Sequence, residues 1–308
     1  MRSRILIALL LGIVPSFAAQ PVHAIFRSID QGRTWSRADR GLPGDARINA
    51  FGAVGGRVFA GTDSGIFVSD NQGQNWRPVA GATQRILAFG TLGSDVYAGS
   101  AKDGLFVSAD QGLSWTAVAG FAPKTVRSLL VYGTRIYAGT DANGVLVSVN
   151  HGRSWTSLGD SLPAHAQIFA MAMLGERMFA GLYAKGLYEW NERDRRWTKA
   201  GVVTPLVLAA AGRTLIAGHN PGGLHYSEAP GNSWSHAAAS LDLPADAPVW
   251  QLGGNNEISF AGAAKGIYYS EDRGRTWIRA RQGLPAESPG VAFHVGRGFV
   301  LAATLIQP

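Results

Sequence analysis

Seven tryptophans recur along the chain about 40 residues apart, and each one closes a copy of the same short motif. Two of the clearest copies are Ser-Ile-Asp-Gln-Gly-Arg-Thr-Trp at residues 28–35 and Ser-Glu-Asp-Arg-Gly-Arg-Thr-Trp at residues 270–277. A period of this length marks one supersecondary unit that is used repeatedly and buries its apolar surface against its neighbours. The tryptophans that define this repeat architecture are Trp35, Trp76, Trp115, Trp155, Trp197, Trp234 and Trp277.

Residues 47–80 show what one repeat contains. Four apolar segments, at 48–54, 57–62, 66–69 and 76–79, are separated by turn residues, which predicts a four-stranded antiparallel meander. In six copies the second segment ends in Ala-Gly, and small residues at a fixed strand position indicate close approach of another backbone. Each motif then falls in the hairpin between the third and fourth strands.

The two ends of the chain complete one another. Before Trp35 the repeat is represented only by residues 25–28, which match a third strand, and after Trp277 residues 291–295 and 298–302 match a first and a second strand. Pairing these ends in one sheet removes the open edge of a radial array. We therefore predict an all-β fold, a seven-bladed β-propeller of four-stranded antiparallel blades. Residues 25–308 form this single domain, which is closed by N-terminal strands pairing with C-terminal strands in one blade.

The first residues are typical of an export signal. Residues 1–4 are basic, residues 5–14 are apolar, and small residues then precede two candidate cleavage sites, after Ala18 and after Ala24. We assign residues 1–24 to a signal peptide because Ile25 begins a strand, with cleavage after Ala18 as the alternative. The interpretation is a protein exported through the Sec system, periplasmic or secreted. No later segment is long and apolar enough to span a membrane, and a monomer is expected.

Composition limits the partners. The chain has 28 basic and 21 acidic residues, for a net charge of +7, and a basic balance favours anionic partners without specifying one. Runs of Lys and Arg interleaved with stacking aromatics do not occur, so a nucleic acid is not expected. Metal-ligand spacing, phosphate loops and nucleophile elbows are absent from the sequence, so no metal, cofactor or catalytic residue is assigned.

The motif itself is given a structural role. Its Asp or Asn can accept local backbone N–H bonds and hold the hairpin, and its Gly supplies left-handed backbone angles. The spacing of an EF-hand loop is absent, so these carboxylates are not assigned to calcium. The residues concerned are Asp30, Asn71, Asp110, Asn150 and Asp272.

The motif Ser-x-Asp-x-Gly-x-Thr-Trp resembles the Asp-box of bacterial-neuraminidase repeats, and the resemblance covers the chain from Ile25 onward. The copies at 28–35, 108–115, 148–155 and 270–277 are close, and 69–76 is nearly so. Ala229 replaces the acid in the copy at 227–234, and the copy at 191–197 is degenerate. The resemblance implies a propeller of a superfamily that includes sialidases, xyloglucanases, sortilin-type receptors and photosystem II assembly factors.

The enzyme branches of this superfamily fit poorly. Sialidases have an Arg-Ile-Pro ahead of the first motif, whereas Arg27 leads directly into it here, and they usually have six blades. Xyloglucanase-like enzymes hold their carboxylates between two tandem propellers, and this chain has the length of one. Single sortilin-like and photosystem II assembly-factor-type propellers are more similar in outline, which implies binding rather than catalysis.

Polar residues gather in loops on the face opposite the motif hairpins. Arg47 and Arg85 start the innermost strand in two successive repeats, and Arg127 lies two residues further along in the next. Three guanidinium groups could grip a carboxylate or phosphate, and the alternative is that they are solvated loop charges. We expect His219 to be a surface residue and Trp250 to be core packing rather than a ligand platform. The full candidate binding face comprises Arg47, Arg85, Arg127, Lys102, Asp103, Tyr183, Lys185, His219, Trp250 and Lys265.

Two hypotheses follow. The first is an exported, non-catalytic binding or assembly propeller that holds a protein or anionic partner on the face opposite the motif hairpins. The second is a glycoside hydrolase, sialidase-like or other, that acts on an acidic glycan gripped by Arg47, Arg85 and Arg127.

Overall fold

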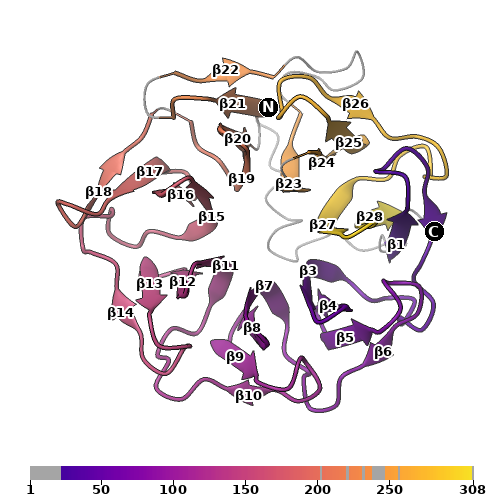
Figure 1. The fold of residues 1–308 in the computed structure, drawn as a ribbon, viewed down its shortest axis with the longest axis horizontal. Helices are drawn as coiled ribbons and strands as arrows, with labels where there is room; N and C mark the ends of the chain where they lie inside the picture. The colour runs from indigo at the N-terminus through magenta and orange to yellow at the C-terminus, as the bar shows by residue number, and fades with distance from the viewer. Residues whose placement is uncertain are drawn as a thin grey trace, which may run out of the picture.

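The computed structural model describes residues 22–201, 203–219, 222–230, 233–237, 247–255 and 257–306. Over these ranges the chain forms strands and turns, without a helix that could cross a membrane. Seven four-stranded sheets stand around a common axis, and the first strand of each blade lies innermost (Figure 1). The predicted all-β, seven-bladed propeller of antiparallel blades is confirmed.

Each blade is a simple meander in which neighbouring strands in the sequence pair in order. Blades 1 to 3 comprise β3 Ile48–Val54, β4 Arg57–Thr62, β5 Gly65–Ser69 and β6 Arg77–Pro78; β7 Ile86–Leu92, β8 Asp95–Ser100, β9 Leu105–Ser108 and β10 Thr116–Ala117; and β11 Val126–Tyr132, β12 Arg135–Thr140, β13 Val145–Ser148 and β14 Thr156–Ser157. Blades 4 to 6 comprise β15 Ile168–Leu174, β16 Arg177–Leu182, β17 Gly186–Asn191 and β18 Arg196–Lys199; β19 Val207–Ala211, β20 Thr214–Gly218, β21 Leu224–Ser227 and β22 Ser235–His236; and β23 Val249–Gly254, β24 Ser259–Ala263, β25 Gly266–Ser270 and β26 Ile278–Arg279.

Blade 7 closes the ring with strands from both ends of the chain. It comprises β27 Gly290–Gly296, β28 Phe299–Ile306, β1 Val22–Ser28 and β2 Ser36–Arg37, so the predicted two-plus-two closure is confirmed. Strand β1 pairs with β28 over its whole length, from Val22 opposite Ile306 to Ser28 opposite Val300. The strand thus begins three residues before the predicted domain boundary at Ile25. The predicted signal peptide lies outside the described residues except for these three.

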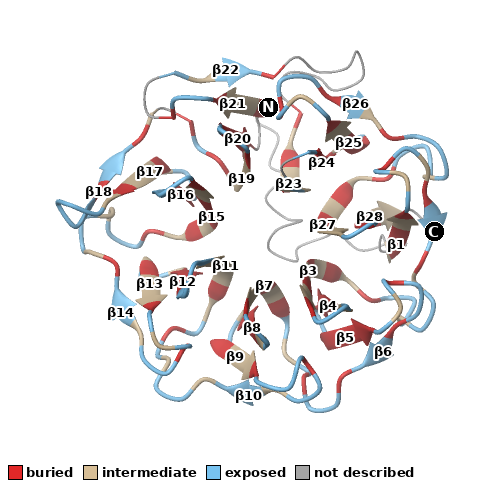
Figure 2. Ribbon diagram, viewed as in Figure 1, coloured by how far each residue is buried: buried red, intermediate tan, exposed pale blue. Residues whose placement is uncertain are grey.

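The core is divided among the blade interfaces instead of filling a centre. Seven clusters of buried side chains each join two neighbouring blades, and each contains one motif tryptophan from the later blade of the pair. Buried residues accordingly lie on the inner and middle strands, whereas the outermost strands are exposed apart from the buried Trp197 of β18 and the half-buried Arg279 of β26 (Figure 2). The rings of Trp35, Trp76, Trp197 and Trp277 are buried, and those of Trp115, Trp155 and Trp234 are half-buried.

The small residues of the second strands let the blades approach. A Cβ added at Gly61 would lie 2.7 Å from Cγ2 of Ile86, on the innermost strand of the next blade. The same contact recurs at Gly99, whose Cβ would lie 2.7 Å from Cγ1 of Val126. The close approach predicted from the Ala-Gly pairs therefore occurs at the interface with the following blade.

Five motif hairpins share one hydrogen-bond network. In the first, the amide of Gly32 donates to Ser28 Oγ at 2.8 Å, and the amide and hydroxyl of Thr34 donate to the two Asp30 oxygens at 2.8 and 2.6 Å. The hydrogen bond from the Thr34 hydroxyl is the largest of the effects that lower the pKa of Asp30 to about 2. The acceptors at the corresponding place in the other four hairpins are Asn71, Asp110, Asn150 and Asp272.

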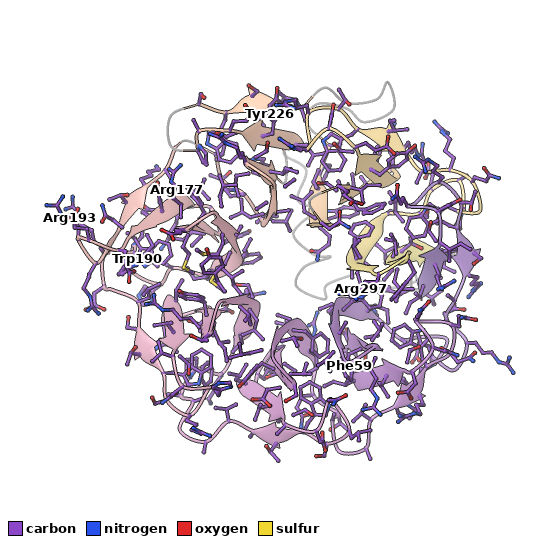
Figure 3. All side chains as sticks on the ribbon, viewed as in Figure 1. Phe59, Arg177, Trp190, Arg193, Tyr226 and Arg297 are labelled. Carbon is purple, nitrogen blue, oxygen red and sulfur yellow. The ribbon has the colours of Figure 1, made fainter. Side chains whose placement is uncertain are left out.

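Polar contacts also join the blades at the hairpin end of each interface. They involve long side chains that reach from one blade to the next, and exposed pairs of this kind contribute little individually. The seven contacts are Arg27 with Gln72, Arg57 with Gln111, Asp95 with His151, Arg135 with Glu192, Arg177 with Pro230, Glu228 with Arg275, and Glu271 with Arg33. The degenerate hairpin of blade 4, which supplies Glu192 to one of these contacts, also directs Arg193 outward from the rim (Figure 3).

Substitution of Tyr97 by phenylalanine is expected to raise the free energy of unfolding by about 1 kcal/mol, because a buried hydroxyl without a partner is costly. The ring is fully buried and its hydroxyl has no hydrogen bond among the described residues, and burial raises its pKa to about 12. Phe59 and Phe179 occupy the equivalent place in blades 1 and 4. Urea denaturation of Tyr97→Phe measures the effect.

Tyr137 provides the control, because it is the equivalent residue of blade 3 and its hydroxyl is hydrogen-bonded to Arg135. Tyr137→Phe should lower the stability. A loss of stability in both variants would contradict the prediction for Tyr97.

Candidate functional site

The meander sorts the loops onto two faces. Turns from first to second strands and hairpins from third to fourth strands share one end of every blade, which we call the hairpin face. Loops from second to third strands and the connections between blades share the other end, the linker face. The structure places the predicted loop residues on the linker face: Lys102 and Asp103 between β8 and β9, Tyr183 and Lys185 between β16 and β17, His219 after β20, and Lys265 between β24 and β25.

A ring of bulged residues marks the inner edge of the linker face. In six blades the pairing of the innermost strand shifts register after its first residue. Bulges re-aim a side chain and recur next to binding sites. We call the six residues at these shifts the bulge ring, and all are half-buried: Asn49, Leu87, Arg127, Phe169, Trp250 and Val291.

Two predicted residues, Arg127 and Trp250, belong to this ring, and sequence reasoning missed the other four. Four members are apolar or aromatic, so the ring as a whole is not a cluster of cations. Trp250, which we predicted to be core packing, is half-buried at the bulge of β23.

In blades 3 and 4 the ring forms a stack with a loop tyrosine. Both guanidinium nitrogens Nε and Nη2 of Arg127 donate to the carboxylate of Asp141, the second at 2.9 Å. The guanidinium carbon of Arg127 lies 4.6 Å from the centre of the Phe169 ring. Phe169 in turn stacks on Tyr183, with ring centres 5.1 Å apart and 24° between planes. Tyr183 is 39% exposed, so the stack ends in an aromatic ring open to a partner.

In blades 1 and 2 the corresponding contacts are polar. Arg85 Nε lies 2.9 Å from Asp63 Oδ1, and Asn49 Nδ2 donates to the same carboxylate oxygen at 2.9 Å. Asp63 therefore links two blades. Asp63 and Asp141 look like ordinary turn residues in the sequence, and nothing in their spacing signals that they hold arginines.

Arg47 lies at the seam where the ring closes. Its neighbour Ile48 donates its amide proton to Nδ1 of His23 on β1 at 2.8 Å. Burial, and then the charge of Arg47, lower the pKa of His23 to about 4. Since His23 is neutral at pH 7, its ring can accept this bond and secure the start of β3 against blade 7.

The structure corrects the expectation for His219. It is 4% exposed and packs on His225 with ring centres 4.8 Å apart, so it is not a surface histidine. Lys185 directs its Nζ to the carbonyl oxygen of Ala164, on the connection to blade 4. These contacts leave Tyr183 as the exposed large hydrophobic side chain on the linker face of the described chain.

A shallow cavity of about 350 Å³ opens on the same face, between blade 3 and its connection to blade 4. Its walls are the β12–β13 loop, from Ala142, and the connection that ends at Ala166. Asp141 is the residue before Ala142, and Gln167 is the residue after Ala166. The carbonyl oxygen of Gln167 accepts the amide proton of Tyr183 at 3.0 Å. The segments that line the cavity are thus continuous in sequence with residues that contact the stack, although no side chain of the stack lines it. Among the described residues, no group of His, Asp and Glu side chains is placed to hold a metal ion.

Fold and site together define a seven-bladed propeller with an aromatic and partly charged linker face. No family model matches the sequence, and no curated protein matches it. Solved structures similar to it include YCF48 from Cyanidioschyzon merolae, with a TM-score of 0.67 and 13% identity over 86% of this chain and 96% of that one. YCF48 bound to D1 peptide gives a TM-score of 0.62 and 16% identity over 85% and 93%.

A glycoside hydrolase shares the fold as well. The GH74 xyloglucanase from Xanthomonas campestris gives a TM-score of 0.64 and 17% identity, and the match covers 91% of this chain but 54% of the enzyme. At such identities the similarity shows the fold alone, because one scaffold hosts many functions.

Proposed function

We propose that this chain is an exported, non-catalytic propeller that holds a segment of a protein partner on its linker face. The observation that carries the proposal is the bulge ring with its exposed extension, Tyr183. Half-buried aromatic side chains on an exposed face are typical anchors for protein segments, since they bury much area at a low entropic cost. Propellers and similar scaffolds present such sites on loops.

The charges favour a protein segment over a polyanion. Arg85 and Arg127 are each paired with a carboxylate of the chain itself, so an anion would compete with Asp63 and Asp141 for them. Partly exposed ion pairs are worth about 0–1 kcal/mol, and a partner carboxylate could still exchange into them. A polyanion that bound by charge alone would therefore meet Arg85 and Arg127 already paired with carboxylates.

One of the similar structures supports a peptide in this role, since YCF48 is bound to D1 peptide there. We also propose that the motif hairpins are Asp-boxes. Supporting this, one network of Ser, Asp or Asn, and Gly recurs in five blades.

Photo-crosslinking in the native host tests the proposed face. The probe p-benzoylphenylalanine replaces either Tyr183 on the linker face or Tyr132 at the end of β11 on the hairpin face, which is a matched control with 42% exposure. We expect one protein adduct from position 183 and none from position 132. No protein adduct from position 183, or equal adducts from both, would refute the proposal. Release of reducing ends from acidic polysaccharides, lost in Arg85→Ala, would support the glycoside hydrolase instead.

The mature N-terminus is expected at Ala19 rather than Ile25. Cleavage after Ala24 would remove Val22 to Ala24 from β1 and with them the bond between His23 and Ile48. It would also place a charged α-amino group on Ile25, which is fully buried. Mass spectrometry of the protein recovered from the periplasm or medium identifies the first residue. A mature chain that starts at Ile25 would contradict this assignment.

A further inference from the structure

Three histidines form a column across blade 5. His219 follows β20 on the linker face, and His225 and His236 are opposite one another on β21 and β22. The ring centres of His219 and His225 are 4.8 Å apart, and those of His225 and His236 are 4.6 Å apart. All three imidazoles are therefore in contact from the face to the outer strand.

Burial increases along the column toward the linker face. His236 is exposed, His225 is half-buried and His219 is buried. Nε2 of His219 and Nδ1 of His225 are buried and have no hydrogen-bond partner among the described residues. Protonation of either ring would thus put a charge where little in the described surroundings solvates it.

No carboxylate of the described chain offsets that cost. Burial, followed by the imidazole of His225 and then that of His236, lowers the pKa of His219 to about 4, and the backbone of Thr204 acts in the opposite direction. Burial and then His236 lower the pKa of His225. His219 and His225 are therefore held in their neutral forms while they stay buried.

The column also supports the proposed binding face. The carbonyl of His219 accepts the amide proton of Val249 at 2.9 Å, and Val249 is the residue before Trp250 of the bulge ring. The His219 amide donates to the carbonyl oxygen of Gly223 at 3.0 Å. Opening the column would release both contacts at the edge where blades 5 and 6 meet.

We infer that the histidine column is an acid-operated latch that opens blade 5 and loosens the linker face around Trp250. This regulation rests on the proposed function of that face. Opened histidines have their ordinary pKa of about 6.5, whereas closed ones are lower, so the closed state is fully favoured above pH 6.5. Its advantage is lost progressively as the pH falls from 6.5 toward 4.

Hydrogen exchange tests the latch without any partner. After correction for intrinsic rates, exchange in β20, β21 and β22 is expected to rise about tenfold or more between pH 7.5 and pH 5.0. The double variant His219→Gln/His225→Gln should remove most of this rise. His294→Gln is the matched control, because burial lowers the pKa of His294 to about 4 in blade 7, away from the column, and the rise in blade 5 should persist in it.

An unchanged exchange rate in the wild type, or a rise that survives the double variant, would overturn the latch. If the double variant does not fold, an NMR titration of the wild type decides, because a pKa near 6.5 for His219 is incompatible with the latch. The Tyr183 crosslink, compared at pH 7.5 and pH 5.0, should weaken at the lower pH. The exchange result does not depend on that crosslink, so the latch and the proposed function can fail separately.

Discussion

Replacement of Gly112 by alanine is expected to destabilise the propeller by about 3 kcal/mol or more. Gly112 lies in the motif hairpin of blade 2 with φ of 85°, and a Cβ there would lie 2.1 Å from Cζ of Phe59 on blade 1. The left-handed backbone costs a non-glycine residue about 1–2 kcal/mol, and overpacking adds about 1–3 kcal/mol. Urea denaturation measures the sum.

Gly56→Ala separates the two causes. Gly56 has nearly the same backbone angle, with φ of 87°, but an added Cβ would meet nothing within 4 Å. This variant should lose only the backbone contribution, about 1–2 kcal/mol. In Gly112→Ala, the further change Phe59→Leu should recover part of the loss. Equal losses of stability in the two variants would show that a Cβ at position 112 does not clash with Phe59.

A chain that starts at Ile25 is expected to be less stable than one that starts at Ala19 by about 3 kcal/mol or more. The shorter chain lacks the pairing of Val22, His23 and Ala24 with β28, and Ala24 is fully buried. It also leaves the amide of Ile48 without the acceptor on His23, and an unpaired buried amide costs about 1–3 kcal/mol.

Both chains can be expressed without a signal and compared by urea denaturation. The point variant His23→Ala in the longer chain isolates the contribution of the imidazole and should account for about 1–2 kcal/mol of the difference. Identical unfolding midpoints for the two chains would mean that the first three residues of β1 do not stabilise the closed propeller.

The fold could be predicted because its determinants are local and repeated. Each motif fixes one hairpin, and counting complete and incomplete units gives both the number of blades and the closure. The glycine of the motif was assigned to the hairpin for its backbone angle. Sequence could not show that it also meets the second strand of the preceding blade, because Phe59 and Gly112 are far apart in the chain.

The site could be predicted only in part, because its determinants are neither repeated nor local. The positions of Tyr183 and Lys185, in a loop between a second and a third strand, could be predicted from the four-stranded meander. The bulge ring has no common residue type, so residues as different as Leu87 and Trp250 occupy the same place. Pairing between Arg127 and Asp141 depends on where a loop folds back, and the burial of His219 depends on two neighbouring histidines that lie in other strands.

The pairing of β1 with β28 determines the order in which the blades can form during synthesis. Among the strands of the propeller, the first in the chain pairs with the last, so blade 7 cannot assemble until all the other strands have been synthesised. Contacts so distant in sequence are slow to form, and blades 1 to 6 can stack while the ring is still open. Completion of the circle then becomes the final, committing step of folding, which an incomplete polypeptide cannot take.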